Sequence, residues 1–151
     1  MVVLFRTFIA TPVRVDGDSM RDTLYDGDIL ILSKLSTTYN RFDIVVINYN
    51  NTKLVKRIIG MPGENVEYKD NELYINGSKF NDIETSRTSN FSLEELYALK
   101  KIPENYYFVM GDNRGNSLDS RDYRVGLIKK EDIVGKTIFR LFPFNKIGTV
   151  K

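Results

Sequence analysis

One serine and one lysine in this chain have positions that suit nucleophilic catalysis. Ser19 follows a short apolar stretch and Gly17, and Lys56 lies among apolar residues at 54–59. The chain contains no histidine and no cysteine, which excludes Ser-His-Asp and Cys-His catalysis and the usual zinc ligands. A serine with a lysine as its general base requires neither residue type. Serine-lysine chemistry is therefore a form of nucleophilic catalysis that this composition permits.

The position of the lysine in a predicted strand suggests how its amine becomes basic. Period-two alternation over residues 52–59 places Leu54, Lys56 and Ile58 on one face. That face is apolar except for Lys56, and burial of a lysine lowers its pKa. A neutral amine can accept a proton from a serine hydroxyl. Taken singly, however, a strand-edge lysine usually extends to water, and a serine before a helical turn is more often an N-cap.

A polar loop at 111–121 follows a predicted buried strand at 106–110. Its hydrogen-bonding side chains are Asp112, Asn113, Arg114, Asn116, Ser117, Asp119, Ser120 and Arg121. A loop of this composition is usually a solvated surface turn. It is also suited to surround a lysine amine with hydroxyl and carboxylate partners and to stabilise the fold through an Asp-Arg pair.

The elements that must position these residues are mostly strands. Short apolar runs bounded by turn residues predict about eight or nine strands and a mainly β fold, a β-sandwich or barrel-like core of antiparallel sheets. Ser92 followed by Glu95 is a capping box that predicts one short helix, ended by Pro103. Turn residues at 70–71 and 76–77 predict two hairpins.

The domain organisation follows from this pattern. Residues 11–63 and 104–151 are predicted to form the β core, and residues 64–103, with the hairpins and the helix, a small inserted lobe. The apolar N-terminus is interrupted by Arg6 and falls far short of the roughly 20 apolar residues that span a bilayer. Residues 1–10 are either the first strand of the core or the end of an anchor helix.

Bulk composition limits the function classes. The chain has 151 residues, 42% of them hydrophobic and 28% charged, which suits one domain with a substantial core. Twenty-two Lys and Arg against 20 Asp and Glu leave a net charge of +2, too small to indicate nucleic-acid binding. The absence of cysteine excludes disulfides and leaves the cellular compartment open.

The three motifs occur in an order that resembles the bacterial type I signal peptidases over nearly the whole chain. Residues 15–20, followed by Thr23 and residues 27–28, resemble the nucleophile motif of that family. Residues 56–64 resemble its lysine motif, and residues 111–121 its third motif. Three separated motifs in this order are highly specific.

The resemblance implies a role for each matching residue. Ser19 attacks the scissile carbonyl, Lys56 is the general base, and Ser117 helps to orient the lysine amine. Asp119 and Arg121 form a structural pair that supports the site. The backbone N–H of Ser19 is a natural donor to the developing oxyanion, and no metal or other cofactor is expected.

The resemblance also implies the substrate and the location. The family removes signal peptides from exported preproteins at the outer face of the cytoplasmic membrane and cuts after small residues in an Ala-X-Ala pattern. We expect an extended substrate beside residues 13–15 and 54–56, with secretory preproteins and a membrane surface as partners and no nucleic acid. The candidate pocket residues are Val13, Val15, Met20, Leu24, Leu54 and Val55.

Three features depart from the family pattern. Asp22 occupies a position where the family usually has proline, which is expected to loosen the turn after the nucleophile. Arg124 stands near the place of a common glycine, and Gly126 follows it. Only eighteen residues precede Ser19, so residues 1–10 are expected to be the remnant of a membrane-anchor juncture in a truncated or anchorless form.

Two other functions remain as alternatives. Self-cleaving repressors of the DNA-damage response share the Ser-Lys logic, but they carry an internal Ala-Gly or Cys-Gly cleavage site, and this chain has neither dipeptide. A β-barrel binding module would use the nine Tyr and nine Phe as stacking surfaces for single-stranded nucleic acid. Salt-dependent binding of such a strand would distinguish it.

Overall fold

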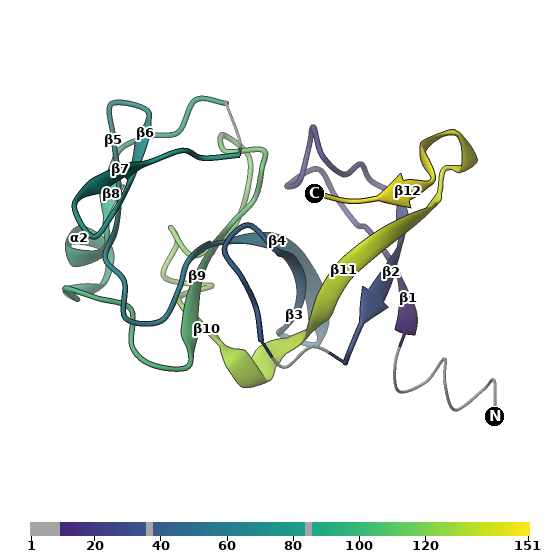
Figure 1. Ribbon diagram of the computed structural model, residues 1–151, viewed down its shortest axis with the longest axis horizontal. Helices are drawn as coiled ribbons and strands as arrows, with labels where there is room; N and C mark the ends of the chain where they lie inside the picture. Colours follow the sequence, from purple (N-terminus) through teal and green to yellow (C-terminus); the bar gives the residue numbers. More distant parts are fainter. Residues whose placement is uncertain (1–9, 36–37, 84–85) are drawn as a thin grey trace.

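The computed structural model describes residues 10–35, 38–83 and 86–151 (Figure 1). Within these ranges the secondary structure is dominated by antiparallel strands, which confirms the predicted mainly β class. The apolar N-terminal segment, for which a strand and an anchor juncture were considered, lies outside the described residues except for Ala10.

The main sheet positions all three motifs. The nucleophile motif follows β1, the lysine motif begins on β4, and the third motif follows β9. Its strand order is β1-β2-β11-β3-β4-β9-β10, with β12 paired to β11, and the pairs are antiparallel. The bounds are β1 (Ala10–Arg14), β2 (Ile29–Ser33), β3 (Ile44–Tyr49), β4 (Thr52–Gly60), β9 (Tyr106–Met110), β10 (Ile128–Lys129), β11 (Ile133–Phe142) and β12 (Gly148–Thr149). The short 3-10 turns η1 (Lys130–Asp132) and η2 (Phe144–Lys146) flank β11.

A second, smaller sheet lies at one end of the molecule, on the left in Figure 1. Its order is β7-β6-β5-β8, formed by β5 (Val66–Lys69), β6 (Glu72–Ile75), β7 (Ser78–Phe80) and β8 (Phe91–Ser92), and helix α2 (Leu93–Tyr97) follows it. The chain leaves the main sheet at the end of β4 and returns at β9, which is the neighbour of β4 in that sheet. From here on, the inserted lobe means residues 66–97, the part of the predicted segment 64–103 that forms this sheet and helix.

Both predicted hairpin turns are present. Asp70 and Asn71 join β5 to β6 with φ of 50° and 64°, and Asn76 and Gly77 join β6 to β7 with φ of 52° and 80°. Positive φ at both central residues is what a two-residue hairpin turn of matching twist requires, and Asn, Asp and Gly tolerate it best. The local sequence therefore sets the register of the lobe.

Helix α2 starts as predicted but ends earlier. The Ser92 hydroxyl accepts a hydrogen bond from the Glu95 N–H at 3.1 Å, which caps the first turn. Ala98 adopts a left-handed conformation and donates its N–H to the Glu94 carbonyl. The helix therefore ends at Tyr97, and the prediction that Pro103 ends it was wrong.

Strand β4 is buried on both faces, not on one. Residues 55–60 are all buried. Val55 packs in one apolar cluster, Ile58 in a second and Ile59 in a third. The alternation that placed Leu54, Lys56 and Ile58 on one face is therefore not an alternation of buried and exposed residues beyond Leu54, because β4 passes between the parts of the core and is covered on each side.

The inserted lobe is attached to the core by buried polar contacts. Arg114, in the loop after β9, donates from Nη1 to Asp82 at 2.7 Å and to the Tyr68 and Thr88 hydroxyls at 3.2 Å. Its side chain is fully buried, at 0% exposure. Because charge-assisted hydrogen bonds in a dry environment are strong, this contact fixes the lobe against the third motif.

A fully buried ion pair joins the remaining segments of the site. Arg57 on β4 donates to Asp112 from Nε at 2.9 Å and from Nη2 at 2.7 Å, and both side chains have 0% exposure. Asp112 also accepts from the Thr23 hydroxyl at 2.5 Å, and Arg57 donates to the Phe42 carbonyl at 2.9 Å. The pair thus connects β4, the loop after β9 and the turn after β1.

Loss of this pair should be severely destabilising. Asp112→Ala leaves the Arg57 guanidinium buried without its counter-charge, which costs about 3–5 kcal/mol out of the roughly 5–15 kcal/mol that stabilises a typical domain. Urea denaturation monitored by circular dichroism measures the change. The matched control is Glu72→Gln, which breaks the exposed pair of Glu72 with Lys79 and should cost less than about 1 kcal/mol. Similar losses in both variants would contradict the expectation.

Candidate active site

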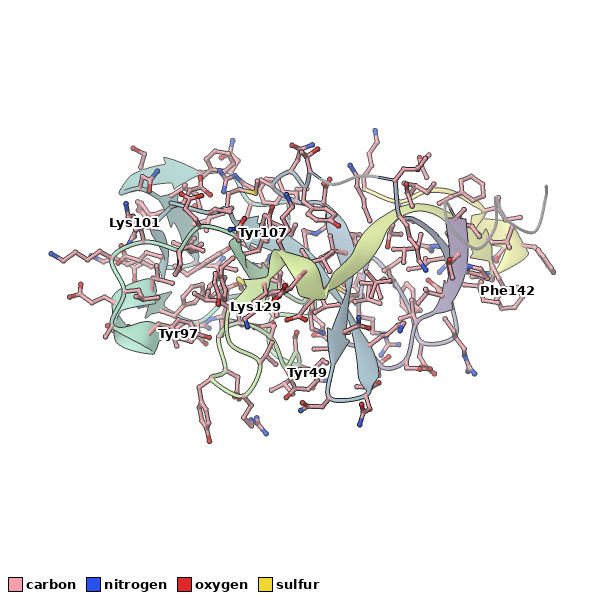
Figure 2. The ribbon with its side chains drawn as sticks, turned by 90° about the horizontal axis from the view of Figure 1, so that it is seen from below. Tyr49, Tyr97, Lys101, Tyr107, Lys129 and Phe142 are labelled. Carbon is pink, nitrogen blue, oxygen red and sulfur yellow. The ribbon has the colours of Figure 1, made fainter. Side chains whose placement is uncertain are left out.

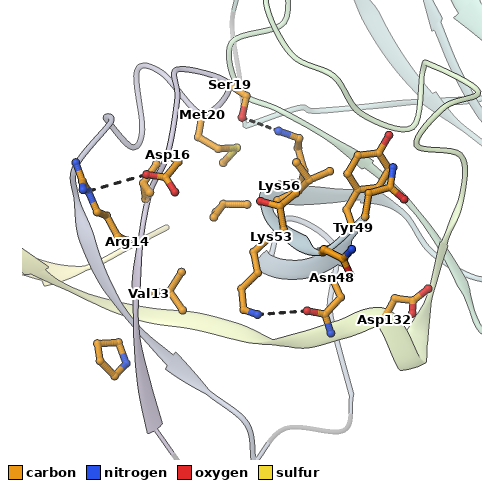
Figure 3. Close-up of a pocket in the computed structure, with 17 residues that line it drawn as sticks. Val13, Arg14, Asp16, Ser19, Met20, Asn48, Tyr49, Lys53, Lys56 and Asp132 are labelled. Carbon is orange, nitrogen blue, oxygen red and sulfur yellow. Dashed lines mark hydrogen bonds and ion pairs between the residues drawn. The ribbon is translucent and has the colours of Figure 1, made fainter.

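Ser19 and Lys56 meet at one end of a groove (Figure 3). The Lys56 Nζ lies 2.5 Å from the Ser19 Oγ, within hydrogen-bond distance. Ser19 follows Gly17, whose φ of +88° is a glycine conformation and whose N–H donates to Asp26 at 2.8 Å. The turn after β1 and the middle of β4 therefore bring a hydroxyl and an amine together.

Burial changes the acidity of the lysine. Lys56 has only 2% of its surface exposed, and this desolvation lowers the pKa of Lys56 to about 8. The nearby Asp119 carboxylate acts in the opposite direction, and Arg121 favours the neutral amine. An appreciable fraction of the amine is therefore uncharged near neutral pH.

Asp119 is the centre of a hydrogen-bond network beside the lysine. It accepts from Arg121 Nε at 2.9 Å and Nη2 at 2.8 Å, from the Ser117 hydroxyl at 2.7 Å and from the Gly111 N–H at 2.9 Å. Burial alone raises the pKa of Asp119, but the hydrogen bonds and charge of Arg121 hold it below its usual value. The carboxylate is therefore ionised and fixed in position.

The contact of Ser117 differs from the expected one. The sequence predicted that Ser117 orients the Lys56 amine. Within the described residues, the hydrogen bond that Ser117 makes goes to the Asp119 carboxylate, and none joins Ser117 to Lys56. Because Ser117 donates its proton to Asp119, its oxygen still has lone pairs that can accept from an amine.

The loop after β9 packs directly on the backbone of the nucleophile. The Asn113 N–H donates to the Ser19 carbonyl at 2.9 Å, and its side-chain amide donates to the Asp18 carbonyl at 3.0 Å. A Cβ on Gly111 would lie 2.4 Å from the Ser19 carbonyl oxygen and 2.1 Å from the Ser117 Oγ. Sequence reasoning gave no separate role to Gly111 or Asn113, although both belong to the third motif.

The groove lies between two strand edges without strand partners in the described part of the chain. Strand β1 pairs only with β2, and β4 pairs with β9 only from Arg57 onward. The groove has a volume of about 810 Å³. Its lining residues are Pro12, Val13, Arg14, Val15, Asp16, Ser19, Met20, Asn48, Tyr49, Asn50, Asn51, Thr52, Lys53, Leu54, Val55, Lys56 and Asp132.

The predicted pocket residues do not all reach this groove. Val13, Val15, Met20, Leu54 and Val55 line it. Leu24 does not, and its inclusion among the pocket residues was wrong. Its N–H bonds to the Met20 carbonyl at 2.8 Å, and the turn so formed packs Leu24 into the core at 0% exposure.

The departures from the family pattern are accommodated locally. In the turn that contains Asp22, the Thr23 N–H donates to the Met20 carbonyl at 2.9 Å. The Thr23 hydroxyl is held by Asp112, so the turn after the nucleophile is closed without proline. Gly126, with φ of +73°, accepts from the Ser120 hydroxyl at 2.8 Å and provides a glycine beyond Arg124.

Two absences concern the described residues only. Within residues 10–35, 38–83 and 86–151, no group of three or more His, Cys, Asp or Glu side chains is arranged to hold a metal ion. None of the helices in the same ranges is long and apolar enough to span a bilayer.

Comparisons with known proteins match one family over most or all of the chain. Residues 1–142 match the family model described as "Signal peptidase, peptidase S26". Signal peptidase I T of Bacillus subtilis (strain 168) is 42% identical over 100% of this chain and 83% of its own length. Signal peptidase I of Bacillus amyloliquefaciens is 40% identical over 100% of this chain and 86% of its own length.

A solved structure shares the fold. The crystal structure of a signal peptidase I from Enterococcus faecalis V583 superposes with a TM-score of 0.59 at 38% identity, covering 66% of this chain and 96% of that one. Fold, site and sequence together define a β-rich serine peptidase. The chain belongs to the signal peptidase family, peptidase S26, whose members remove signal peptides.

The close approach of Gly111 to the nucleophile makes a prediction. Gly111→Ala must displace Ser117 or the Ser19 backbone, and a displacement of about 1 Å at a reacting group can cost on the order of 100-fold in rate. Gly115→Ala is the control, because a Cβ there meets nothing within 4 Å. Turnover of a preprotein by both variants checks this expectation, and a fully active Gly111→Ala enzyme would contradict it.

Proposed function

We propose that this chain is an endopeptidase that removes signal peptides with Ser19 as nucleophile and Lys56 as general base. The observation that supports this most is the 2.5 Å contact between the Ser19 Oγ and a buried amine whose pKa is lowered to about 8. A lysine activates serine only when it is neutral and in reach of the hydroxyl. The contact puts the amine in reach of the hydroxyl, and burial favours its neutral form, both without histidine.

The reaction needs few groups. The Lys56 amine takes the proton of Ser19 as Oγ attacks the scissile carbonyl. The resulting ammonium then gives this proton to the leaving amine, and the neutral amine next activates the water that hydrolyses the acyl-enzyme. The Ser19 N–H, which makes no hydrogen bond among the described residues, is the donor to the oxyanion.

The network beside the lysine has a supporting role in this proposal. Asp119, held by two hydrogen bonds from Arg121, fixes the Ser117 hydroxyl beside the amine. The Ser117 oxygen is then able to accept a hydrogen bond from the Lys56 amine during the reaction, which would orient the amine lone pair toward Ser19. Burial lowers the pKa of Lys56, and the Asp119 carboxylate opposes this effect while Arg121 adds to it.

The groove suits an extended peptide. Its two unpaired edges, on β1 and on residues 52–56 of β4, allow a peptide to form strand hydrogen bonds on either side. Apolar residues, among them Met20 and Val55, contribute to the lining of the end nearest the dyad. Cleavage after Ala-X-Ala follows, because side chains at the first and third positions before the cut point to the same face.

A membrane surface is the proposed site of action, on the extracytoplasmic side. Exposed apolar residues occur on β11, on η2 and in the segment before β12, and one of them, Phe142, lies at the end of the molecule opposite Lys101 and Tyr97 (Figure 2). They are Ile138, Leu141, Phe142, Phe144 and Ile147, with exposures of 41–76%. Exposed apolar patches of this kind mark protein or membrane contacts.

The dyad assignment is tested by substitution. Ser19→Ala and Lys56→Ala should each abolish cleavage of an Ala-X-Ala preprotein, because one removes the nucleophile and the other its base. Mass spectrometry of the products measures the cleavage, and circular dichroism checks the fold. Lys69→Ala, an exposed lysine on β5, is the control and should cleave normally. Full activity in either dyad variant would refute the assignment.

The pH dependence follows from the lowered pKa. Only the neutral Lys56 amine accepts a proton, so kcat/KM should be constant well above pH 8 and fall about tenfold per pH unit below the pKa of about 8. Initial rates on a peptide substrate between pH 5 and 10 measure the profile. An acidic limb governed by a group near the free lysine value of roughly 10.4 would contradict burial of the amine.

The membrane proposal predicts an effect of vesicles. Phe144, at 76% exposure, should contribute to lipid contact, so Phe144→Ser should weaken co-sedimentation with phospholipid vesicles. Tyr123→Ser is the control, because Tyr123 is 85% exposed but lies on the loop before β10. If neither binding nor turnover responds to vesicles, the membrane contact is wrong.

A further inference from the structure

The groove changes character along its length. Near the dyad, Met20 and Val55, the chain neighbours of Ser19 and Lys56, contribute apolar side chains to its lining (Figure 3). Farther from the dyad it becomes polar, where the turn between β3 and β4 and the start of β4 supply the wall. The residues of this polar half are Asn48, Tyr49, Asn50, Asn51, Thr52 and Lys53. A peptide longer than the Ala-X-Ala segment therefore meets polar groups at its far end.

Lys53 is the cation of this polar half. Its Nζ donates to the Asn48 side chain at 3.4 Å (Figure 3), a long hydrogen bond to a neutral group. No carboxylate in the described part of the chain lies within ion-pair distance of it. Arg14, the cation on the opposite wall, has a carboxylate partner in Asp16 at 4.0 Å, although both side chains are exposed and the pair is weak. Lys53 thus has charge available for a ligand.

The position of Lys53 places it beside a bound peptide. It lies on the edge of β4 that has no strand partner before Arg57, three residues before Lys56. At about 3.3 Å per residue, the two lysines are roughly 10 Å apart along the strand. If the first residue before the cut lies at Lys56, the fourth or fifth lies at Lys53.

Asp132 also lines the groove and has no ion pair among the described residues, but it is less well placed than Lys53 to contact a bound peptide. Asp132 belongs to η1, which leads into β11, and β11 pairs with β3 rather than with β4. One strand therefore separates Asp132 from the edge that would bind the peptide. Its carboxylate offsets Lys53 only at longer range.

We propose that Lys53 is a specificity-determining residue that favours an acidic over a basic side chain at the fourth or fifth position before the cleaved bond. This inference rests on the proposed function, since it assumes cleavage at the dyad with the amino-terminal side of the peptide in the groove. Attraction between exposed charges is modest, so acidic peptides should be favoured about two- to fivefold over basic ones. The preference should decrease in high salt, which screens exposed charges.

The test compares two otherwise identical peptides with a fixed Ala-X-Ala segment. In the first pair, one peptide has Asp and the other has Lys at the fourth position before the cut. A second pair has the same two residues at the fifth position. The measured quantity is the ratio of kcat/KM for the Asp peptide to that for the Lys peptide. Lys53→Met should bring this ratio close to one, and Lys53→Glu should reverse it.

The control variant changes the net charge of the protein by the same amount as Lys53→Glu, but at a site outside the groove. Lys101→Glu alters an exposed lysine near the inserted lobe (Figure 2), outside the groove, and should keep the ratio of the unsubstituted enzyme. A ratio that Lys53→Glu leaves unchanged, or that is one in the unsubstituted enzyme at both positions, would overturn the inference. Cleavage at another bond, or cleavage by Ser19→Ala, would instead overturn the proposed function itself.

Discussion

The site depends on one constraint, the exclusion of water from the Lys56 amine. A lysine in solution is almost fully protonated at neutral pH and cannot accept a proton. Here the side chain is 2% exposed, and its amine reaches the Ser19 hydroxyl. The strand that carries it is covered on both faces over residues 55–60, so the side chain is held in the core while its amine faces the end of the groove.

Three segments far apart in the sequence must be held together to maintain this contact. The turn after β1 carries Ser19, β4 carries Lys56, and the loop after β9 carries Asp119. Asp112 joins all three, because it accepts from Arg57 of β4 and from Thr23 of the nucleophile turn. The electrostatics of the site and the stability of the fold therefore rest on the same buried groups.

The features that were predicted correctly from the sequence are those that neighbouring residues determine. The hairpin turns at 70–71 and 76–77 and the cap at Ser92 depend on nearby residues, and the mainly β class followed from short apolar runs bounded by turn residues. The Arg57-Asp112 pair was not predicted, because its members lie far apart along the chain and alternation gave Arg57 no role. Leu24 was misplaced for a related reason: only the closed turn shows that it enters the core instead of the groove.

The attachment of the inserted lobe limits how this architecture can vary. The chain leaves the main sheet at β4 and re-enters it at the neighbouring strand β9. The length of the lobe alone therefore has little effect on the positions of the catalytic strands. Arg114 changes this, since its guanidinium, at 0% exposure, takes its counter-charge from Asp82 of the lobe. A shortened chain without the lobe would leave this guanidinium beside the catalytic loop without its counter-charge and without its hydroxyl partners Tyr68 and Thr88. Evolutionary trimming of the lobe would therefore require replacement of this arginine in the same step.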